Sequence, residues 1–266
     1  MRDLRRLLEA TSDIACAAGA LIQEIQAEGG VEASSKEDLS PVTRADREAD
    51  SLLKQELLRL APIAWLSEET ADNPKRLAQE RLWVVDPLDG TKEFMKGLPE
   101  YSVAVALVEH GEPMLGVVHN PVTGDTFSAA RGLGAYRNGS PIQVREGNRI
   151  LASRSETARG EFEPFESAWD VQPIGSIELK LALVAAGEAA VTFSRGPKHE
   201  WDVCAGALIV TEAGGLATDV FGGPLHYNQA FPKVKGILAG AVDACARARE
   251  QIDAIGASDR MDELKN

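Results

Sequence analysis

The chain has 266 residues, of which 44% are hydrophobic and 26% are charged, a composition typical of a soluble globular protein with a large core. With 28 basic and 41 acidic side chains, its formal net charge is -13. This charge argues against binding to a nucleic-acid polymer, because neutralising a phosphate backbone needs clustered Lys and Arg. A small phosphorylated substrate stays compatible with it, since a bound divalent cation reverses the local potential.

The three cysteines, Cys16, Cys204 and Cys245, lie far apart, without the paired spacing of a zinc site or a redox dithiol. Such a sparse, odd set is typical of a reducing compartment without a disulfide framework. The first residues contain no uninterrupted apolar stretch like the core of a signal peptide, and no window is long enough to span a bilayer. We therefore expect a cytoplasmic protein without a membrane span.

The first half of the chain begins with two predicted helices. Apolar residues recur at helical spacing over 4–26, and Gly29-Gly30 ends this helix. A polar segment at 34–41 predicts a loop or a mobile hairpin, after which Thr43 caps a second helix over 44–60. Short apolar runs then predict strands over 63–66, 82–85, 101–109, 114–119 and 126–130.

A polar stretch at 146–149 predicts a boundary between two halves of the chain, 1–148 and 149–266. The second half is expected to contain strands over 150–153, 190–193, 216–218 and 237–239, and helices over 178–186, over 202–213 and from about 243. Strands and helices are mixed in both halves without strict alternation. This order predicts a layered sandwich of the α+β or α/β class.

Two predicted strands end in acidic residues. Glu68 and Glu69 follow the first of them, and Asp86 and Asp89 follow the second on the turn Asp86-Pro87-Leu88-Asp89-Gly90-Thr91. The proline restricts one backbone dihedral and the glycine permits a conformation denied to other residues, so the turn holds its two carboxylates rigidly. Carboxylate and carbonyl oxygens are the ligands that Mg²⁺ prefers, and such a pair can bridge ions roughly 3.5–4 Å apart. The turn therefore predicts a divalent metal site for phosphoryl transfer.

Two further features belong to this prediction. Gly90-Thr91 begins a short predicted helix whose first free N–H groups would point at an anion beside the metal. Asp202 precedes a run of small and apolar residues near the end of the chain. Taken alone, an Asp at such a position is more often a helix N-cap than a metal ligand.

The segments that carry a family resemblance are Pro41-Val42-Thr43-Arg44-Ala45-Asp46, Glu68-Glu69, 83–91, 201–206 and Thr211-Glu212-Ala213-Gly214-Gly215. In this order and spacing, over roughly residues 36–245, the chain resembles the inositol monophosphatase superfamily. The resemblance implies that the layered sandwich has the αβαβα order of that superfamily. It also implies a metal-dependent phosphatase that is inhibited by lithium.

The resemblance assigns roles residue by residue. It implies metal ligation, with two or three Mg²⁺ ions, by Glu68, Asp86, the Leu88 carbonyl, Asp89 and Asp202. Thr91 together with Asp46 is implied to orient and deprotonate the attacking water. Glu69 is implied to act behind the metal ligands through a water. His119 lies in an apolar strand, and we interpret it as a structural residue.

Within the superfamily, Thr91-Lys92-Glu93-Phe94 and Gly196-Pro197 resemble the CysQ-type 3'(2'),5'-bisphosphate nucleotidases. Arg195 stands where inositol phosphatases tend to carry an acid, and a cation there suits a second phosphate better than a polyol. Lys180 resembles the lysine of the nucleotidase substrate loop, but one extra residue precedes it, so a solvated helix lysine is an equal interpretation. The implied substrate contacts are Gly90, Thr91, Gly175, Ser176, Lys180, Arg195 and Asp202.

We therefore predict a hydrolase that converts adenosine 3',5'-bisphosphate to AMP and phosphate with a metal-activated water and no phosphoenzyme. An alternative is an inositol monophosphatase or a related sugar or histidinol phosphate phosphatase, favoured by the segment 210–215 and by the lack of an adenine-stacking aromatic motif. A catalytically silent, metal-binding regulatory protein is disfavoured because every acidic position is occupied. The expected partner is a small phosphorylated molecule, and a homodimer is left open.

Overall fold

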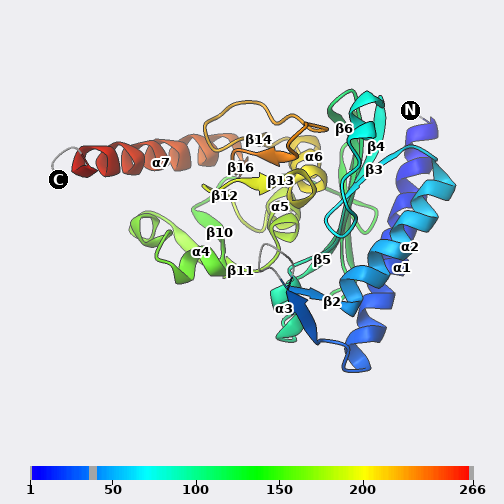
Figure 1. The fold of residues 1–266 in the computed structure, drawn as a ribbon. Coiled ribbons are helices and arrows are strands. Elements are labelled where there is room, and N and C mark those ends of the chain that lie inside the picture. The colour runs from blue at the N-terminus through cyan, green and yellow to red at the C-terminus, as the bar shows by residue number, and fades with distance from the viewer. Residues whose placement is uncertain (1, 36–40, 264–266) are drawn as a thin grey trace.

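Layers of helices and sheets alternate through the molecule (Figure 1). The structure is a computed structural model, and it describes residues 2–35 and 41–263. The helices are α1 Arg2–Ala27, α2 Arg44–Leu60, α3 Thr91–Met95, α4 Arg154–Ala158, α5 Ile177–Ala185, α6 Cys204–Glu212 and α7 Val242–Glu263, with short 3-10 turns at Pro74–Ala78, Glu163–Phe165 and Glu200–Asp202. A seven-stranded sheet contains, in spatial order, β3 Ala64–Ser67, β4 Arg81–Asp89, β5 Ser102–Glu109, β6 Glu112–Asn120, β7 Asp125–Ala130, β8 Ala135–Arg137 and β9 Ser140–Ile142. A five-stranded sheet contains β11 Asp170–Ile174, β10 Arg149–Ser153, β12 Val191–Ser194, β16 Ile237–Gly240 and β14 Leu216–Thr218. Two small pairs complete the described strands: β1 Ala33–Ser35 with β2 Pro41–Thr43, and β13 Lys198–His199 with β15 Lys233–Val234.

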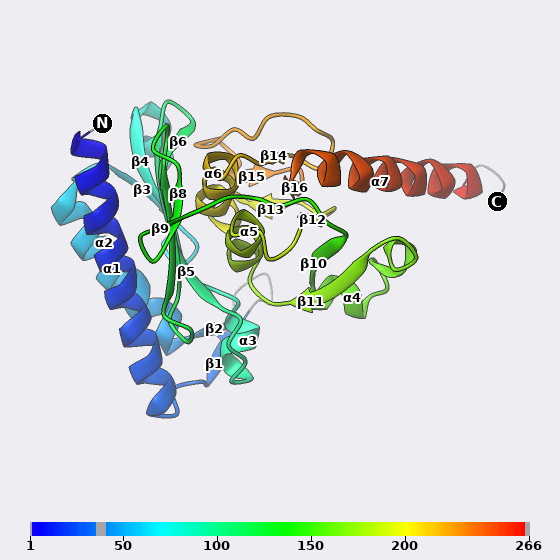
Figure 2. The same cartoon turned by 180° about the vertical axis from the view of Figure 1, so that it is seen from behind.

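The layers follow the expected αβαβα order. α1 and α2 pack on the outer face of the seven-stranded sheet, α5 and α6 lie between the two sheets, and α7 packs on the far side of the five-stranded sheet (Figures 1 and 2). The predicted sandwich is thus confirmed. The two sheets lie on either side of residue 148, and the division of the chain into halves at that point stays a prediction.

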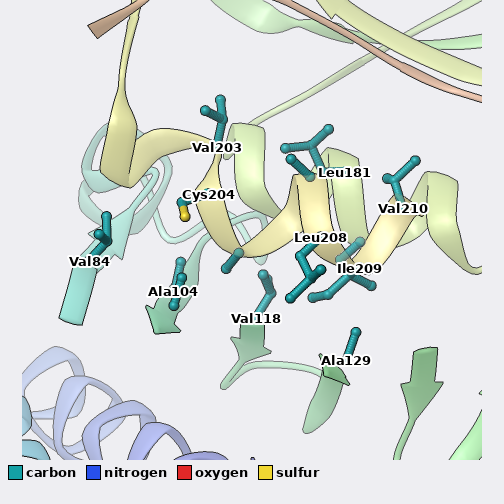
Figure 3. Close-up of a cluster of buried hydrophobic side chains, with 14 of the residues drawn as sticks. Val84, Ala104, Val118, Ala129, Leu181, Val203, Cys204, Leu208, Ile209 and Val210 are labelled. Atoms are coloured by element: carbon teal, nitrogen blue, oxygen red, sulfur yellow. The ribbon is translucent and has the colours of Figure 1, made fainter. Parts of the chain in front are cut away.

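Both faces of the central strands β4 and β5 are buried, and alternate residues of these strands face different helices. In β4, Trp83 and Val85 join the cluster formed with α1 and α2. Their neighbours Leu82 and Val84 join the cluster formed with α5 and α6. Figure 3 shows the second cluster, in which side chains from the strands meet those of α6. Burial on both faces explains why these strands read as continuous apolar runs rather than as alternating patterns.

The second helix begins where the sequence predicts. The Thr43 hydroxyl accepts a hydrogen bond from the Ala45 N–H at 3.2 Å, and the Thr43 N–H donates to the Asp46 carboxylate at 2.7 Å. This reciprocal capping satisfies donors that the first turn of a helix leaves without partners. It also holds the buried Asp46 carboxylate in one place at the start of α2.

The carboxyl ends of parallel strands from both sheets lie at the same place in the fold. β3 and β4 run parallel in the first sheet, and β10 runs parallel to both β11 and β12 in the second. Loops that follow such strand ends form the usual ligand sites of open α/β sheets. β4 also breaks its pairing with β5 between Asp86 and Asp89, which frees the intervening backbone from the ladder.

The structure adds elements that the sequence did not predict. β8, β9, β11, β13, β15 and α4 are five residues long or shorter. The segment predicted as a loop or hairpin begins and ends in the antiparallel pair β1 and β2, and residues 36–40 lie outside the described part. Among the described residues no helix is long and apolar enough to cross a membrane. The three cysteines are free thiols.

The close packing of α6 on the first sheet generates a stability prediction. A Cβ added at Gly116 of β6 would lie 2.7 Å from the Ala205 carbonyl oxygen of α6, so Gly116→Ala must force the helix away from the sheet. We expect a loss of about 1–3 kcal/mol in the free energy of unfolding, measured by urea denaturation. Gly196→Ala is the matched control, because nothing lies within 4 Å of its added Cβ. Equal stability of the two variants would contradict this packing.

Candidate active site

A cavity of about 260 Å³ lies where the strand ends of both sheets meet. The residues that line it on the side of the first sheet are Pro41, Glu68, Asp86, Leu88, Asp89, Gly90, Thr91, Lys92 and Glu93. Those on the side of the second sheet are Ser153, Arg154, Ser155, Glu156, Ile174, Gly175, Ser176, Ile177, Lys180, Phe193, Ser194, Lys198 and Asp202. The structure therefore brings the predicted metal ligands together with most of the predicted substrate contacts.

Asp86 and Asp89 owe their positions to the break in the β4 ladder. The Asp86 carboxylate is 1% exposed and accepts a hydrogen bond from the Leu88 N–H at 3.0 Å. The Asp89 carboxylate accepts from the Ser176 hydroxyl at 2.6 Å and from the Glu178 N–H at 2.7 Å. One oxygen of each carboxylate is thus tied to the protein, and Asp89 links the first sheet to the start of α5.

Asp202 enters the cavity from the second half of the chain. It ends the 3-10 turn Glu200–Asp202, and the helix predicted to begin at this residue begins at Cys204. Its carboxylate accepts a hydrogen bond from the His199 N–H at 2.8 Å. The His199 ring stacks on Trp201 with centroids 4.5 Å apart, which fixes the turn that carries Asp202.

The grouped carboxylates repel one another. Burial and the charges of Glu68, Asp89 and Asp202 hold the pKa of Asp86 well above its usual range. Burial also raises the pKa of Asp89, against the hydrogen bond from Ser176 and the charge of Lys180. Burial and the charges of Glu68 and Asp89 raise the pKa of Asp202 to about 7. A cation placed among these groups would relieve the repulsion and favour their ionised forms.

The donor set suits Mg²⁺, because it consists of hard carboxylate and carbonyl oxygens without a thiol or imidazole. The described residues contain no group of three His, Cys, Asp or Glu side chains already assembled at metal-binding separations. Asp86, Asp89 and Asp202 each hold one oxygen on a protein N–H or O–H. Metal binding therefore requires the remaining oxygens to converge on the ion.

Thr91 and Asp46 form a hydrogen-bonded pair beside the acidic residues. The Thr91 hydroxyl lies 2.9 Å from an Asp46 oxygen and 3.2 Å from the Leu88 carbonyl, both of which only accept. The Thr91 hydroxyl therefore donates its hydrogen to one of these two oxygens, and its lone pairs can accept a hydrogen bond from a water. The adjacent Gly90 has φ +101°, and a Cβ there would lie 2.8 Å from the Glu100 carbonyl oxygen, so this turn requires glycine.

The predicted substrate loop, which begins at Gly175 and Ser176, is held by Glu100, an acidic residue that the sequence did not single out. Glu100 accepts hydrogen bonds from the Gly175 N–H at 2.8 Å and from the Arg154 guanidinium at 2.7 Å. Lys180 is buried, and its ammonium donates to the Ser176 carbonyl at 2.9 Å. Burial lowers the pKa of Lys180 to about 8, so the side chain still carries its charge at neutral pH.

Three predicted site residues do not line the cavity, and one of them, Asp46, is connected to it through Thr91. Arg195 does not line the cavity, and its guanidinium lies 3.4 Å from the Glu161 carbonyl and 4.0 Å from the Glu161 carboxylate. Glu69 does not line the cavity either, and its N–H donates to the Ser67 hydroxyl at 3.4 Å. His119, interpreted as structural, is buried and its Nδ1 contacts the Thr126 hydroxyl at 2.9 Å.

The cavity wall contains residues that sequence reasoning missed, chiefly Arg154, Glu156 and Lys198. Arg154 directly follows β10, a strand that the sequence did predict, and Glu156 lies two residues further along in α4. The strand-end argument that identified Glu68 and Asp86 would have identified them too. Lys198 carried no comparable signal, because the two-residue strand β13 that holds it exists only through its pairing with β15.

The chain is similar to proteins of a known family over most of its length. The inositol monophosphatase family matches residues 3–255 of the chain. The 3'(2'),5'-bisphosphate nucleotidase CysQ of Shigella flexneri is 38% identical over 84% of this chain and 94% of its own. A fructose-1,6-bisphosphatase/inositol-1-monophosphatase of Thermotoga maritima is 36% identical over 68% of this chain and 72% of its own. The solved structure of an IMPase from Thermotoga maritima superposes with a TM-score of 0.81, 29% identity, and coverage of 94% of this chain and 98% of that one.

The raised pKa values generate a prediction about Mg²⁺ binding. Because Asp202 has a pKa of about 7 without metal and only its ionised form binds a cation, Mg²⁺ should displace about half a proton from Asp202 at pH 7 and close to one at pH 6. Below pH 7 the apparent affinity should fall by about tenfold per pH unit and proton, and above that pH the contribution of Asp202 should level off.

Isothermal titration calorimetry in buffers of different ionisation enthalpy counts the released protons. Asp202→Asn should remove the contribution of this group, whereas Asp219→Asn, outside the cavity, should not. A constant Mg²⁺ affinity between pH 6 and pH 8 would show that the acidic residues do not bind the ion together.

Proposed function

The chain belongs to the inositol monophosphatase family and is a metal-dependent phosphatase, and from this premise we propose that its substrate is a 3'(2'),5'-bisphosphate nucleotide. The proposed reaction removes the 3'-phosphate of adenosine 3',5'-bisphosphate and yields AMP and phosphate. The single observation that carries this choice is the charge distribution around the cavity. Arg154, Lys180 and Lys198 line the same space as the acidic residues.

These cations have a physical consequence for substrate choice. The reacting phosphate belongs beside the acidic residues, where a bound cation would hold it. A substrate with one phosphate and neutral hydroxyls would leave Arg154 and Lys198 with only Glu100 and Glu156 as anionic partners. A second phosphate supplies a further anion, and a guanidinium group has more donors than the two that bind Glu100. The role first given to Arg195 therefore passes in this proposal to Arg154 and Lys198.

Similarity to relatives supports the family more strongly than the substrate. The two relatives named above are 38% and 36% identical to this chain, although their names describe different substrates. The cavity wall is the better guide, because substrate choice depends on groups that contact the non-reacting part of the molecule. A catalytically silent protein is disfavoured, since Glu68, Asp86, Asp89 and Asp202 are all present at one cavity.

In the proposed mechanism, Mg²⁺ would be held by Glu68, Asp86, the Leu88 carbonyl, Asp89 and Asp202, with two or three ions in place. Bound magnesium supplies Lewis-acid stabilisation of the phosphoryl oxygens and the attacking water. The Thr91 hydroxyl accepts a hydrogen bond from that water and donates one to Asp46, so a proton of the water passes through Thr91 to the Asp46 carboxylate. The N–H groups near Gly90 and Thr91 orient the phosphate, and Glu69 supports the ligands through a water.

Attack by this water occurs in line with the leaving 3'-oxygen, so the new P–O bond forms as the old one breaks and no phosphoenzyme arises. The released 3'-oxygen takes up a proton from solvent water and becomes the hydroxyl of AMP. Lithium inhibition, which the family resemblance implies, belongs to the same proposal.

The substrate proposal predicts a specific order of kcat/KM. Adenosine 3',5'-bisphosphate should exceed both adenosine 3'-monophosphate and inositol 1-phosphate. Arg154→Gln should lower the value for the bisphosphate by about 10- to 150-fold, the worth of a charge-assisted hydrogen bond, and leave the monophosphate nearly unchanged. Arg149→Gln is the matched control, because this exposed arginine lies outside the cavity, at the other end of β10, and pairs with Asp170 of the neighbouring strand β11. A clear preference for the inositol ester would overturn the proposal.

The mechanism predicts that Asp89→Asn loses nearly all Mg²⁺-dependent hydrolysis while staying folded. The amide oxygen can still accept from Ser176, but the charge that holds the cation is gone. Activity assays with circular dichroism as the folding check measure both properties. Asp170→Asn serves as the control, since it removes an exposed carboxylate outside the cavity. Surviving activity in Asp89→Asn would show that the metal ligands are wrongly assigned.

A further inference from the structure

Glu156 occupies a position in the cavity that the mechanism does not use. It lies in the first turn of α4, directly after β10, and its N–H donates to the Ser153 hydroxyl that caps the helix. The residue lines the cavity although it is only 4% exposed. A carboxylate this deeply buried is normally held by several donors.

Only one of its two oxygens is held. Oε1 accepts a hydrogen bond from the Ser194 hydroxyl and lies 3.4 Å from the Lys198 ammonium. Oε2 is buried and has no hydrogen-bond partner among the described residues. Five buried side-chain nitrogen and oxygen atoms of the described residues lack a partner, and only Glu156 Oε2 belongs to a residue that lines the cavity.

The chemistry of a partner for this oxygen is restricted. A carboxylate oxygen only accepts hydrogen bonds, so the partner must present an O–H or N–H group. An ionised phosphate has neither and would be repelled by the negative charge. Lys198 neutralises much of that charge from the other oxygen, which lets a neutral donor lie here while a phosphate binds elsewhere in the cavity. The last torsion of a glutamate is broad, so the carboxylate can rotate to present Oε2 to a donor bound in the cavity that Glu156 lines.

We propose that Glu156 is a specificity-determining residue whose Oε2 accepts a hydrogen bond from a hydroxyl or amino group on the non-reacting part of the substrate. This inference rests on the proposed nucleotide substrate. Adenosine 3',5'-bisphosphate offers two such donors, the ribose 2'-hydroxyl and the 6-amino group of the base. The cavity then rejects a nucleotide that lacks the donor, because its binding leaves a buried carboxylate oxygen without a partner.

The test compares three nucleotides that share both phosphates: adenosine 3',5'-bisphosphate, its 2'-deoxy analogue and inosine 3',5'-bisphosphate. Wild-type kcat/KM should fall about 10- to 150-fold for one of the two analogues. In Glu156→Gln, an amide N–H₂ replaces Oε2 while the amide oxygen still accepts from Ser194. The variant should treat the parent nucleotide as poorly as that analogue and discriminate between them less than about threefold.

Glu166→Gln, at an exposed position of the following segment, is the control and should keep the wild-type discrimination. Wild-type enzyme that hydrolyses all three nucleotides equally would overturn the inference whether or not the variant folds. Discrimination that persists unchanged in a folded Glu156→Gln would overturn it as well. If the wild type hydrolyses none of these nucleotides, the proposed function fails and the inference falls with it. If the wild type hydrolyses the three nucleotides equally well, only the proposed role of Glu156 fails and the proposed function stands.

Discussion

The repulsion among buried carboxylates at the end of β4 is the constraint on which the rest of the site depends. Burial raises the pKa of Asp86, Asp89 and Asp202. The charges of Glu68 and Asp89 raise the pKa of Asp86 and Asp202 further, so the folded chain stores unfavourable charge at one place. The surrounding structure limits this cost with hydrogen bonds to single carboxylate oxygens. The other oxygens of the three aspartates can converge on a divalent cation, whose binding would convert the repulsion into attraction.

Helix α5 connects the two sides of the site, the end of β4 and the segment before α6. At its start, Ser176 and the Glu178 N–H hold Asp89 of the first sheet. The buried Glu178 carboxylate then accepts from the N–H groups of Ala205 and Gly206, in the first turn of α6. Asp202 lies directly before that helix. The spacing between the two aspartates is therefore set by one buried helix rather than by flexible loops, which suits a metal site that needs defined geometry.

The cavity combines two charge environments in a strongly acidic protein. Its acidic side suits a cation and the phosphate bound to it, whereas Arg154 and Lys198 offer a second anion a place on the opposite strand ends. Each of these cations already faces a carboxylate, Glu100 or Glu156, so each is held in a defined position before substrate arrives. Preorganised charges of this kind favour specificity, because a substrate must match them without rearranging the wall.

The sequence by itself determined the parts that depend on local patterns. The capped start of α2 at Thr43, the strand leading into Asp86, and the turn around Gly90 all follow from helix capping, apolar runs and glycine conformation. Only the tertiary structure decided which distant residues complete the cavity. It brought Lys198 there through a two-residue strand pair and turned Arg195 toward Glu161. The physical reason is that strand pairing and burial join residues far apart in the chain, and no local pattern records which of them will meet.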